Sequence, residues 1–255
     1  MPLNIAQRHE QILEKLRKNR MVDVLDLSKE FNVSAVTIRK DLKLLENRKL
    51  LFRSHGKAIR FNPYITGRPI NEKEKISVEE KRRIGAAAVE ILETGDNIII
   101  ASGTTLIEFA RQIDNVKGLT VITATLNTAL SVSKNADIEV IQLGGTVRVN
   151  ASSVIGPLSE KMLDEFTCNK LFLGVDGIDL EYGLTTTSAM EASLNKKMIA
   201  AAQKIIVLAD ASKFGKKGFG RICDLDEVDQ IITDKSIDPA TKEKLLEKGV
   251  DVRVV

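Results

Sequence analysis

Hydrophobic positions recur at helical spacing through the first 50 residues. The stretches IAQRHEQILEKLRKN (5–19) and VLDLSKEF (24–31) each keep their apolar residues near one face, which predicts two amphipathic helices. Asn32 follows the second stretch as a turn residue, and Ser34 is a favourable N-cap for a third helix over 34–50. The chain therefore opens with three short helices in succession.

The pattern changes beyond residue 60. Residues 61–76 hold two prolines and many charges, which is typical of a linker running into a helix. From there apolar runs alternate with helical patterns, and near-continuous apolar strands of this kind indicate a mostly parallel sheet covered on both faces. We predict an α/β protein with domains at 1–60 and 77–255. The runs predicted as strands are 97–101, 120–123, 139–143, 170–175, 204–209 and 230–233.

Composition narrows the class of protein. Hydrophobic residues make up 43% of the chain and charged residues 29%, and no apolar run approaches the roughly 20 residues of a membrane span. The first residues lack the apolar stretch of a signal peptide, so we expect a cytoplasmic protein without a membrane partner. Cys168 and Cys223 lie far apart and only two histidines are present, so we expect neither a metal site nor a cofactor.

Charge is distributed unevenly. Residues 1–60 hold 14 Lys/Arg against 7 Asp/Glu, a net charge of +7, and the remaining residues hold 24 against 28, a net charge of −4. The two parts together give the +3 of the whole chain. A basic head on a mildly acidic body favours contact between the head and a polyanion, although a solvated lysine-rich surface has the same composition.

The third predicted helix has two distinct faces. Ile38, Leu42 and Leu45 recur at i, i+4 and i+7 and define its buried stripe. The opposite face combines cations, hydroxyls and one small apolar group, which suits a DNA major groove, although most charged helices simply face water. The candidate DNA-binding residues of this helix are Ser34, Val36, Thr37, Arg39, Lys40 and Lys43.

A basic hairpin follows the third helix. Residues 50–61 (LLFRSHGKAIRF) form two strand-like runs around a turn, whose tip carries the further DNA-binding candidates Arg53, His55 and Lys57. Three helices and a basic hairpin are the outline of a winged helix-turn-helix, in which the hairpin lies along the DNA backbone or minor groove. This combination favours double-stranded DNA as a partner.

The same residues carry a family resemblance. The stretch VSAVTIRKDLKLLENRKLLFRSHGKA resembles the N-terminal signature of the DeoR family of transcriptional regulators, a Val-Ser-x-x-Thr-Ile-Arg-Arg/Lys-Asp-Leu core followed by Arg-x-His-Gly-Gly-Ala. The resemblance implies that Thr37, Arg39 and Lys40 lie at the DNA. Lys57 stands where the family usually has the second glycine, which adds a charge to the wing.

Small or polar turns follow the strands predicted in the body. Ligands bind beyond the carboxyl ends of parallel strands, so these turns can converge on one crevice. Cations, hydroxyls and backbone N–H groups suit a phosphate there, and carboxylates suit sugar hydroxyls. Each turn alone is more typical of an ordinary loop or helix cap. The candidate effector-binding residues are Ser102, Gly103, Thr104, Thr105, Thr123, Gly144, Arg148, Asp176, Glu191, Asp210 and Lys213.

The body also resembles the DeoR-type sensor domain, through its Ser-Gly-Thr-Thr turn, LGGTVR, FLGVDGID, GLTT, Glu191 and LADASKFG. The resemblance implies a Rossmann-like sheet similar to those of ribose-5-phosphate isomerase and acetyl-CoA transferase relatives. Ala101 and Ala124 stand where the family usually has polar residues, and we expect both changes to remove polar groups near the ligand.

Three functions compete at this point. The first is a regulator that binds operator DNA as a homo-oligomer, either a dimer or a tetramer. It represses a sugar catabolic operon under control of a phosphorylated sugar, and this function uses both the basic head and the body. A phosphosugar isomerase-like enzyme, with Glu191 or Asp210 as general base and Lys213 stabilising an enediolate, leaves the head without a purpose. A constitutive DNA-binding structural protein leaves the pocket without one. We therefore predict a regulator and not an enzyme.

Overall fold

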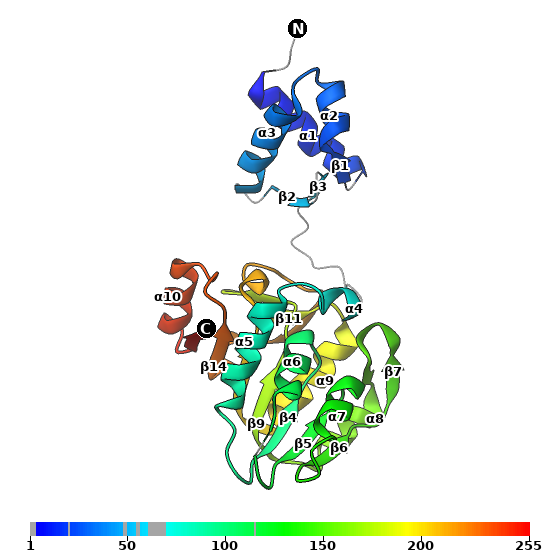
Figure 1. Cartoon of the computed structure of the whole chain (residues 1–255), viewed down its shortest axis with the longest axis vertical. Coiled ribbons are helices and arrows are strands. Elements are labelled where there is room, and N and C mark those ends of the chain that lie inside the picture. Colours follow the sequence, from blue (N-terminus) through cyan, green and yellow to red (C-terminus); the bar gives the residue numbers. More distant parts are fainter. Residues whose placement is uncertain (1–3, 20, 48–49, 55–56, 61–69, 115) are drawn as a thin grey trace. The chain divides into compact units, whose positions relative to one another are not determined.

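The computed structural model describes residues 4–19, 21–47, 50–54, 57–60, 70–114 and 116–255 (Figure 1). The chain divides into two compact units, Met1–Pro63 and Tyr64–Val255. Each unit has its own cluster of buried hydrophobic residues. The two units are therefore described separately.

The N-terminal unit contains the three predicted helices and a small antiparallel sheet of order β1–β3–β2. The strand β1, between the first two helices, was not predicted because three residues are too few to show an alternating pattern. The described elements are α1 (Ile5–Asn19), β1 (Met21–Asp23), α2 (Val24–Glu30), α3 (Ala35–Asn47), β2 (Leu51–Ser54) and β3 (Lys57–Arg60).

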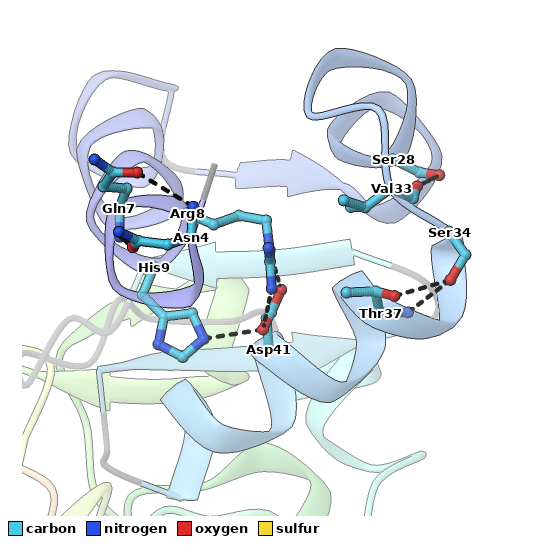
Figure 2. Close-up of polar contacts among 9 residues, drawn as sticks. All are labelled: Asn4, Gln7, Arg8, His9, Ser28, Val33, Ser34, Thr37 and Asp41. Atoms are coloured by element: carbon cyan, nitrogen blue, oxygen red, sulfur yellow. Dashed lines mark hydrogen bonds and ion pairs between the residues drawn. The ribbon is translucent and has the colours of Figure 1, made fainter. Parts of the chain in front are cut away.

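The turn between α2 and α3 is fixed by local hydrogen bonds. Asn32 adopts a left-handed conformation with φ of 51°, which asparagine tolerates better than most residues. The Ser28 hydroxyl donates to the carbonyl of Val33 at 2.6 Å. The Ser34 hydroxyl accepts the Thr37 N–H at 3.1 Å, so Ser34 is the N-cap of α3 as predicted (Figure 2).

A seven-stranded parallel sheet forms the centre of the C-terminal unit, in the order β15–β14–β12–β9–β4–β5–β6. Ile98, Ile99 and Ile100 are all fully buried. Because successive side chains point to opposite faces, the sheet is covered on both sides. The predicted α/β class is confirmed. The strands are β4 (Asn97–Ile100), β5 (Thr120–Thr123), β6 (Glu139–Gln142), β9 (Cys168–Leu173), β12 (Ala202–Leu208), β14 (Gln230–Thr233) and β15 (Asp251–Val254).

Helices connect these strands. Aromatic packing joins the helix α6 to the sheet, because the ring centroids of Phe109 on α6 and Phe172 on β9 lie 4.4 Å apart. Among the helices in the described residues, none combines the length and apolar composition needed to cross a membrane. The helices of this unit are α4 (Ile70–Lys73), α5 (Val78–Val89), α6 (Thr104–Arg111), α7 (Leu126–Val132), α8 (Pro157–Leu163), α9 (Ala189–Ala200) and α10 (Pro239–Glu247).

Two small antiparallel sheets lie outside the central one. One pairs β7 with β8, and the other has the order β10–β11–β13. None of these strands was predicted, because runs of three or four residues are too short to show a strand pattern. They are β7 (Thr146–Arg148), β8 (Ser153–Ile155), β10 (Gly177–Asp179), β11 (Gly183–Thr186) and β13 (Gly220–Cys223).

Candidate functional site

A cavity of about 130 Å³ opens at the carboxyl edge of the parallel sheet. Its lining comes from α4, the turn after β4, the end of β7, the turn after β9, the end of β11, the first turn of α9 and the 3₁₀ turn after β12. Segments far apart in the sequence therefore meet where parallel α/β sheets usually bind ligands.

The Ser-Gly-Thr-Thr turn forms one wall of this pocket. The N-cap of α6 is Gly103, with φ of 153° and no side-chain cap, so the first-turn N–H groups and the positive helix end are available to an anion. The Thr125 hydroxyl donates to the Ser102 hydroxyl at 3.3 Å and orients it. A Cβ at Gly174 would lie 2.7 Å from the Ser102 carbonyl oxygen, so this approach of β9 to the turn requires glycine.

Two ion pairs cross the pocket. Lys73 Nζ lies 2.6 Å from Asp176 Oδ1, and Arg148 Nη1 lies 2.6 Å from Glu191 Oε2. Lys213 also lines the pocket, but its Nζ lies as far as 4.0 Å from its acidic partner, Oδ2 of Asp210. Of these three cations, Lys213 is the one held least closely by an acid.

Asp176 is buried, and three donors contact its two carboxylate oxygens. Oδ1 receives Lys73, and Oδ2 accepts the Thr186 hydroxyl and the Thr187 N–H, both at 3.2 Å. Burial disfavours its charge, but Lys73, Lys213 and the Thr187 N–H together hold the pKa of Asp176 below its ordinary value. The carboxylate is therefore ionised at neutral pH.

Most of the predicted effector residues line this pocket: Ser102, Gly103, Thr104, Thr105, Arg148, Asp176, Glu191 and Lys213. Three predicted residues do not. Thr123 is fully buried, and its hydroxyl donates to the Ile100 carbonyl. Gly144 is exposed, and its carbonyl accepts the Ser159 hydroxyl.

Asp210 is the third, because its buried carboxylate caps the following 3₁₀ turn by accepting the Ser212 N–H at 3.1 Å. The isomerase alternative used Asp210 or Glu191 as a general base. Asp210 does not reach the pocket lining, and Glu191 is paired with Arg148. Asp210 is therefore not placed as that alternative requires, and Glu191 could act as a base only after giving up Arg148.

The structure also corrects the expectation for two alanines and adds one lysine. Ala101 and Ala124 are fully buried in the core and do not line the pocket, so their side chains remove no polar group from it.

Lys73 lines the pocket although its segment was predicted as linker. A four-residue helix shows no periodicity, and only the pairing with Asp176 reveals its place.

The recognition face of α3 has the burial that the helical wheel predicts. Ile38, Leu42 and Leu45 are buried, and Val36 is 58% exposed. Arg39, Lys40, Lys43 and Ser34 are exposed, and Thr37 is half-buried. DNA contact by these residues remains a prediction.

The hairpin is described only in its strands. Arg53 on β2 pairs in register with Ala58, and Lys57 on β3 pairs with Ser54. His55, the remaining candidate at the tip, lies outside the described residues.

A buried polar cluster that the sequence analysis did not predict joins α3 to α1 (Figure 2). Arg8 Nε donates to Asp41 Oδ2 at 2.5 Å, and His9 Nε2 lies 3.1 Å from Asp41 Oδ1. The hydrogen bond to Asp41 raises the pKa of Arg8 above its ordinary value, so Arg8 stays charged. Asp41 thus positions the helix that carries the exposed cations.

Two family models match the chain. The DeoR-like helix-turn-helix domain matches residues 8–63, and the DeoR C terminal sensor domain matches residues 76–235. The uncharacterized HTH-type transcriptional regulator YulB of Bacillus subtilis is 35% identical over 98% of this chain and 97% of its own length. The HTH-type transcriptional regulator GlpR of Haloferax volcanii is 35% identical over 97% of this chain and 96% of its own.

A third relative and one solved structure also match the chain. The transcriptional repressor AccR of Agrobacterium fabrum is 30% identical over 98% of this chain and 99% of its own length. Among solved structures, ribose 5-phosphate isomerase from Plasmodium falciparum matches 55% of this chain and 54% of its own, with 20% identity and a TM-score of 0.40.

Proposed function

This chain belongs to the DeoR family of transcriptional regulators and is a DNA-binding regulator rather than an enzyme, and from that premise we propose that it represses a sugar catabolic operon under control of a phosphorylated sugar. In this proposal a homo-oligomer holds operator DNA through its N-terminal units. The phosphorylated sugar binds the C-terminal pocket and lowers the affinity for the operator.

The exposed face of α3 supports the DNA-binding half of the proposal. Arg39, Lys40 and Lys43 present cations that can bind guanine or phosphate, and the exposed Val36 can contact a thymine methyl. The buried pair of Arg8 and Asp41 holds this helix on α1. A rigidly placed helix with such a face fits a major groove.

The observation that carries the effector half is the convergence of three cations and the α6 N-terminus on one pocket. Lys73, Arg148 and Lys213 line it, against the carboxylates of Asp176 and Glu191. A phosphate carries a charge near −2, which a helix end of about +0.5 does not balance. Lys213 is the best placed additional cation, because no carboxylate holds it closely. The carboxylates can accept the hydroxyls of a sugar.

A paired screen tests this proposal. Operator DNA is selected from a random library with the full chain, and phosphorylated sugars are compared with their unphosphorylated forms by calorimetry and by release of that DNA. We expect a phosphorylated sugar to bind and to release the DNA, and its unphosphorylated form to do neither. Equal binding of both forms would contradict the phosphate site.

Lys213→Ala locates the phosphate. Loss of one charge-assisted contact costs about 1.5–3 kcal/mol, so we expect affinity for the sugar phosphate to fall at least about tenfold while DNA binding persists. The control is Lys204→Ala, because Lys204 is exposed near the opposite end of β12. Unchanged affinity in Lys213→Ala would place the phosphate elsewhere, with Arg148 the next candidate.

A further inference from the structure

The short helix α4 lies against the proposed effector pocket. Ile70 and Lys73, its first and last residues, both line the cavity. Lys73 reaches Asp176, which follows β9 and lies 103 residues further along the chain. One ion pair therefore joins the segment that leads from the N-terminal unit to the wall of the pocket.

A buried lysine holds the same segment from the other side. Lys81 on α5 is 3% exposed, and its ammonium donates to the carbonyls of Lys73 at 2.5 Å and Ile76 at 2.6 Å. Burial lowers the pKa of Lys81, Asp210 counteracts this effect and Lys213 adds to it. Lys81, which holds α4 through these two carbonyls, is thus influenced by the charges of Lys213 and Asp210 beside the proposed phosphate site.

A ligand in this pocket competes with Lys73 for Asp176. Among the described residues, Oδ2 already accepts two donors, whereas Oδ1 accepts only Lys73, so a sugar hydroxyl that donates to Asp176 shares Oδ1 with the Lys73 ammonium. Thr186 is a buried residue of β11, and Thr187 follows it directly, so these donors are fixed by a sheet. The Lys73 side chain is 27% exposed and extends from a four-residue helix. Lys73 is the donor that can move, and a ligand phosphate would attract it.

We propose that the Lys73–Asp176 ion pair is a latch, which an anionic ligand opens by taking Lys73 away from Asp176 and so shifts α4. Residues 64–69 connect α4 covalently to the N-terminal unit that ends at Pro63. A ligand changes DNA affinity only if it binds two states of the protein differently, and the closed and open latch are two such states. The identity of the ligand rests on the proposed function, whereas the latch itself does not.

Hydrogen–deuterium exchange of the full chain tests the latch directly. The amides of Glu74, Lys75 and Ile76 donate to carbonyls within the α4 segment and report its opening. We expect Lys73→Gln to raise their exchange at least about fivefold without ligand. Inorganic phosphate, compared with chloride at equal ionic strength, should raise exchange in the wild type but not in this variant.

Two further variants separate charge from structure. Lys73→Arg keeps the cation, so we expect exchange like that of the wild type. Lys75→Gln removes an exposed lysine of the same turn and should also behave as the wild type. Exchange in Lys73→Gln that matches the wild type, or an equal rise in Lys75→Gln, would overturn the proposal.

Operator binding tests the regulatory consequence. With the latch already open, ligand-free Lys73→Gln should bind the selected operator about tenfold more weakly than the wild type, at a temperature where circular dichroism shows the C-terminal unit still folded. If no phosphorylated sugar binds the wild type, the proposed effector fails while the exchange result still decides the latch. If a sugar phosphate releases DNA equally from wild type and Lys73→Gln, the latch alone fails.

Discussion

Asp41→Ala should destabilise the N-terminal unit severely, although Asp41 belongs to the DNA-binding helix. Arg8 is 6% exposed and Asp41 is 3% exposed, and two hydrogen bonds join them. Removing one partner of a buried ion pair costs about 3–5 kcal/mol, because the remaining charge stays buried. At roughly 0.05–0.15 kcal/mol per residue, a unit of this size has only about 3–9 kcal/mol of stability. We expect the variant to lose at least about a third of that stability.

Calorimetric melting of the full chain measures this loss. One kcal/mol shifts the melting temperature of a small domain by about 4–8 °C, so the N-terminal transition should fall by at least about 12 °C. The C-terminal transition should stay in place, since the two units have separate cores. Operator binding should disappear at temperatures above the new transition.

A double variant distinguishes a buried charge from a general packing defect. Arg8→Met with Asp41→Leu removes both charges and fills similar volumes, and apolar replacements of whole buried pairs are often neutral or stabilising. We expect it to melt well above Asp41→Ala. The reasoning is refuted if Asp41→Ala melts within a few degrees of the wild type, or if the double variant is no more stable than the single one.

Three further predictions concern the DNA-binding face and the pocket. Arg39→Ala should abolish specific operator binding in gel shifts and leave circular dichroism unchanged, because Arg39 is exposed beside a buried stripe; tight selective binding would sink its assignment. Lys57→Gly should reduce the salt dependence of operator binding by about one phosphate contact, and an unchanged slope would mean that Lys57 makes no such contact. The folded pKa of Asp176 is depressed, so its charge stabilises the fold at neutral pH and this contribution is lost as the pH falls below about 4. In Asp176→Asn the stability of the C-terminal unit should therefore fall less steeply as the pH drops below about 4. An unchanged dependence of stability on pH would contradict the lowered pKa of Asp176.

Local periodicity was sufficient for the long elements. The spacing of Ile38, Leu42 and Leu45 predicted which side of α3 is buried, and those residues are indeed in the core. The apolar runs predicted six strands of the central sheet, because buried parallel strands are hydrophobic on both faces. The last strand, β15, was missed because Asp251 and Arg253 interrupt its apolar pattern.

Long-range pairing explains what the sequence could not predict. Parallel topology brings strand ends together, which is why Ser102, Arg148 and Lys213 were predicted in one pocket. Nothing local shows that Asp41 belongs with Arg8, 33 residues away, because both residues read as surface charges on amphipathic helices. Short elements stabilised by such contacts, as α4 is, carry no periodic signal of their own.

The pairing of charges also decides what each pocket residue can do. From the sequence, Arg148 and Lys213 were both candidate cations at strand ends, and Lys213 was preferred because it follows its strand closely in a glycine-containing loop. The structure separates them, because Arg148 would exchange Glu191 for a phosphate and Lys213 has no comparably close acid to give up. An exchange returns less net free energy than a new contact, since the broken pair offsets part of the gain. A ligand phosphate should therefore gain more from Lys213, whereas the paired cations Lys73 and Arg148 are suited to changing partners when the ligand arrives.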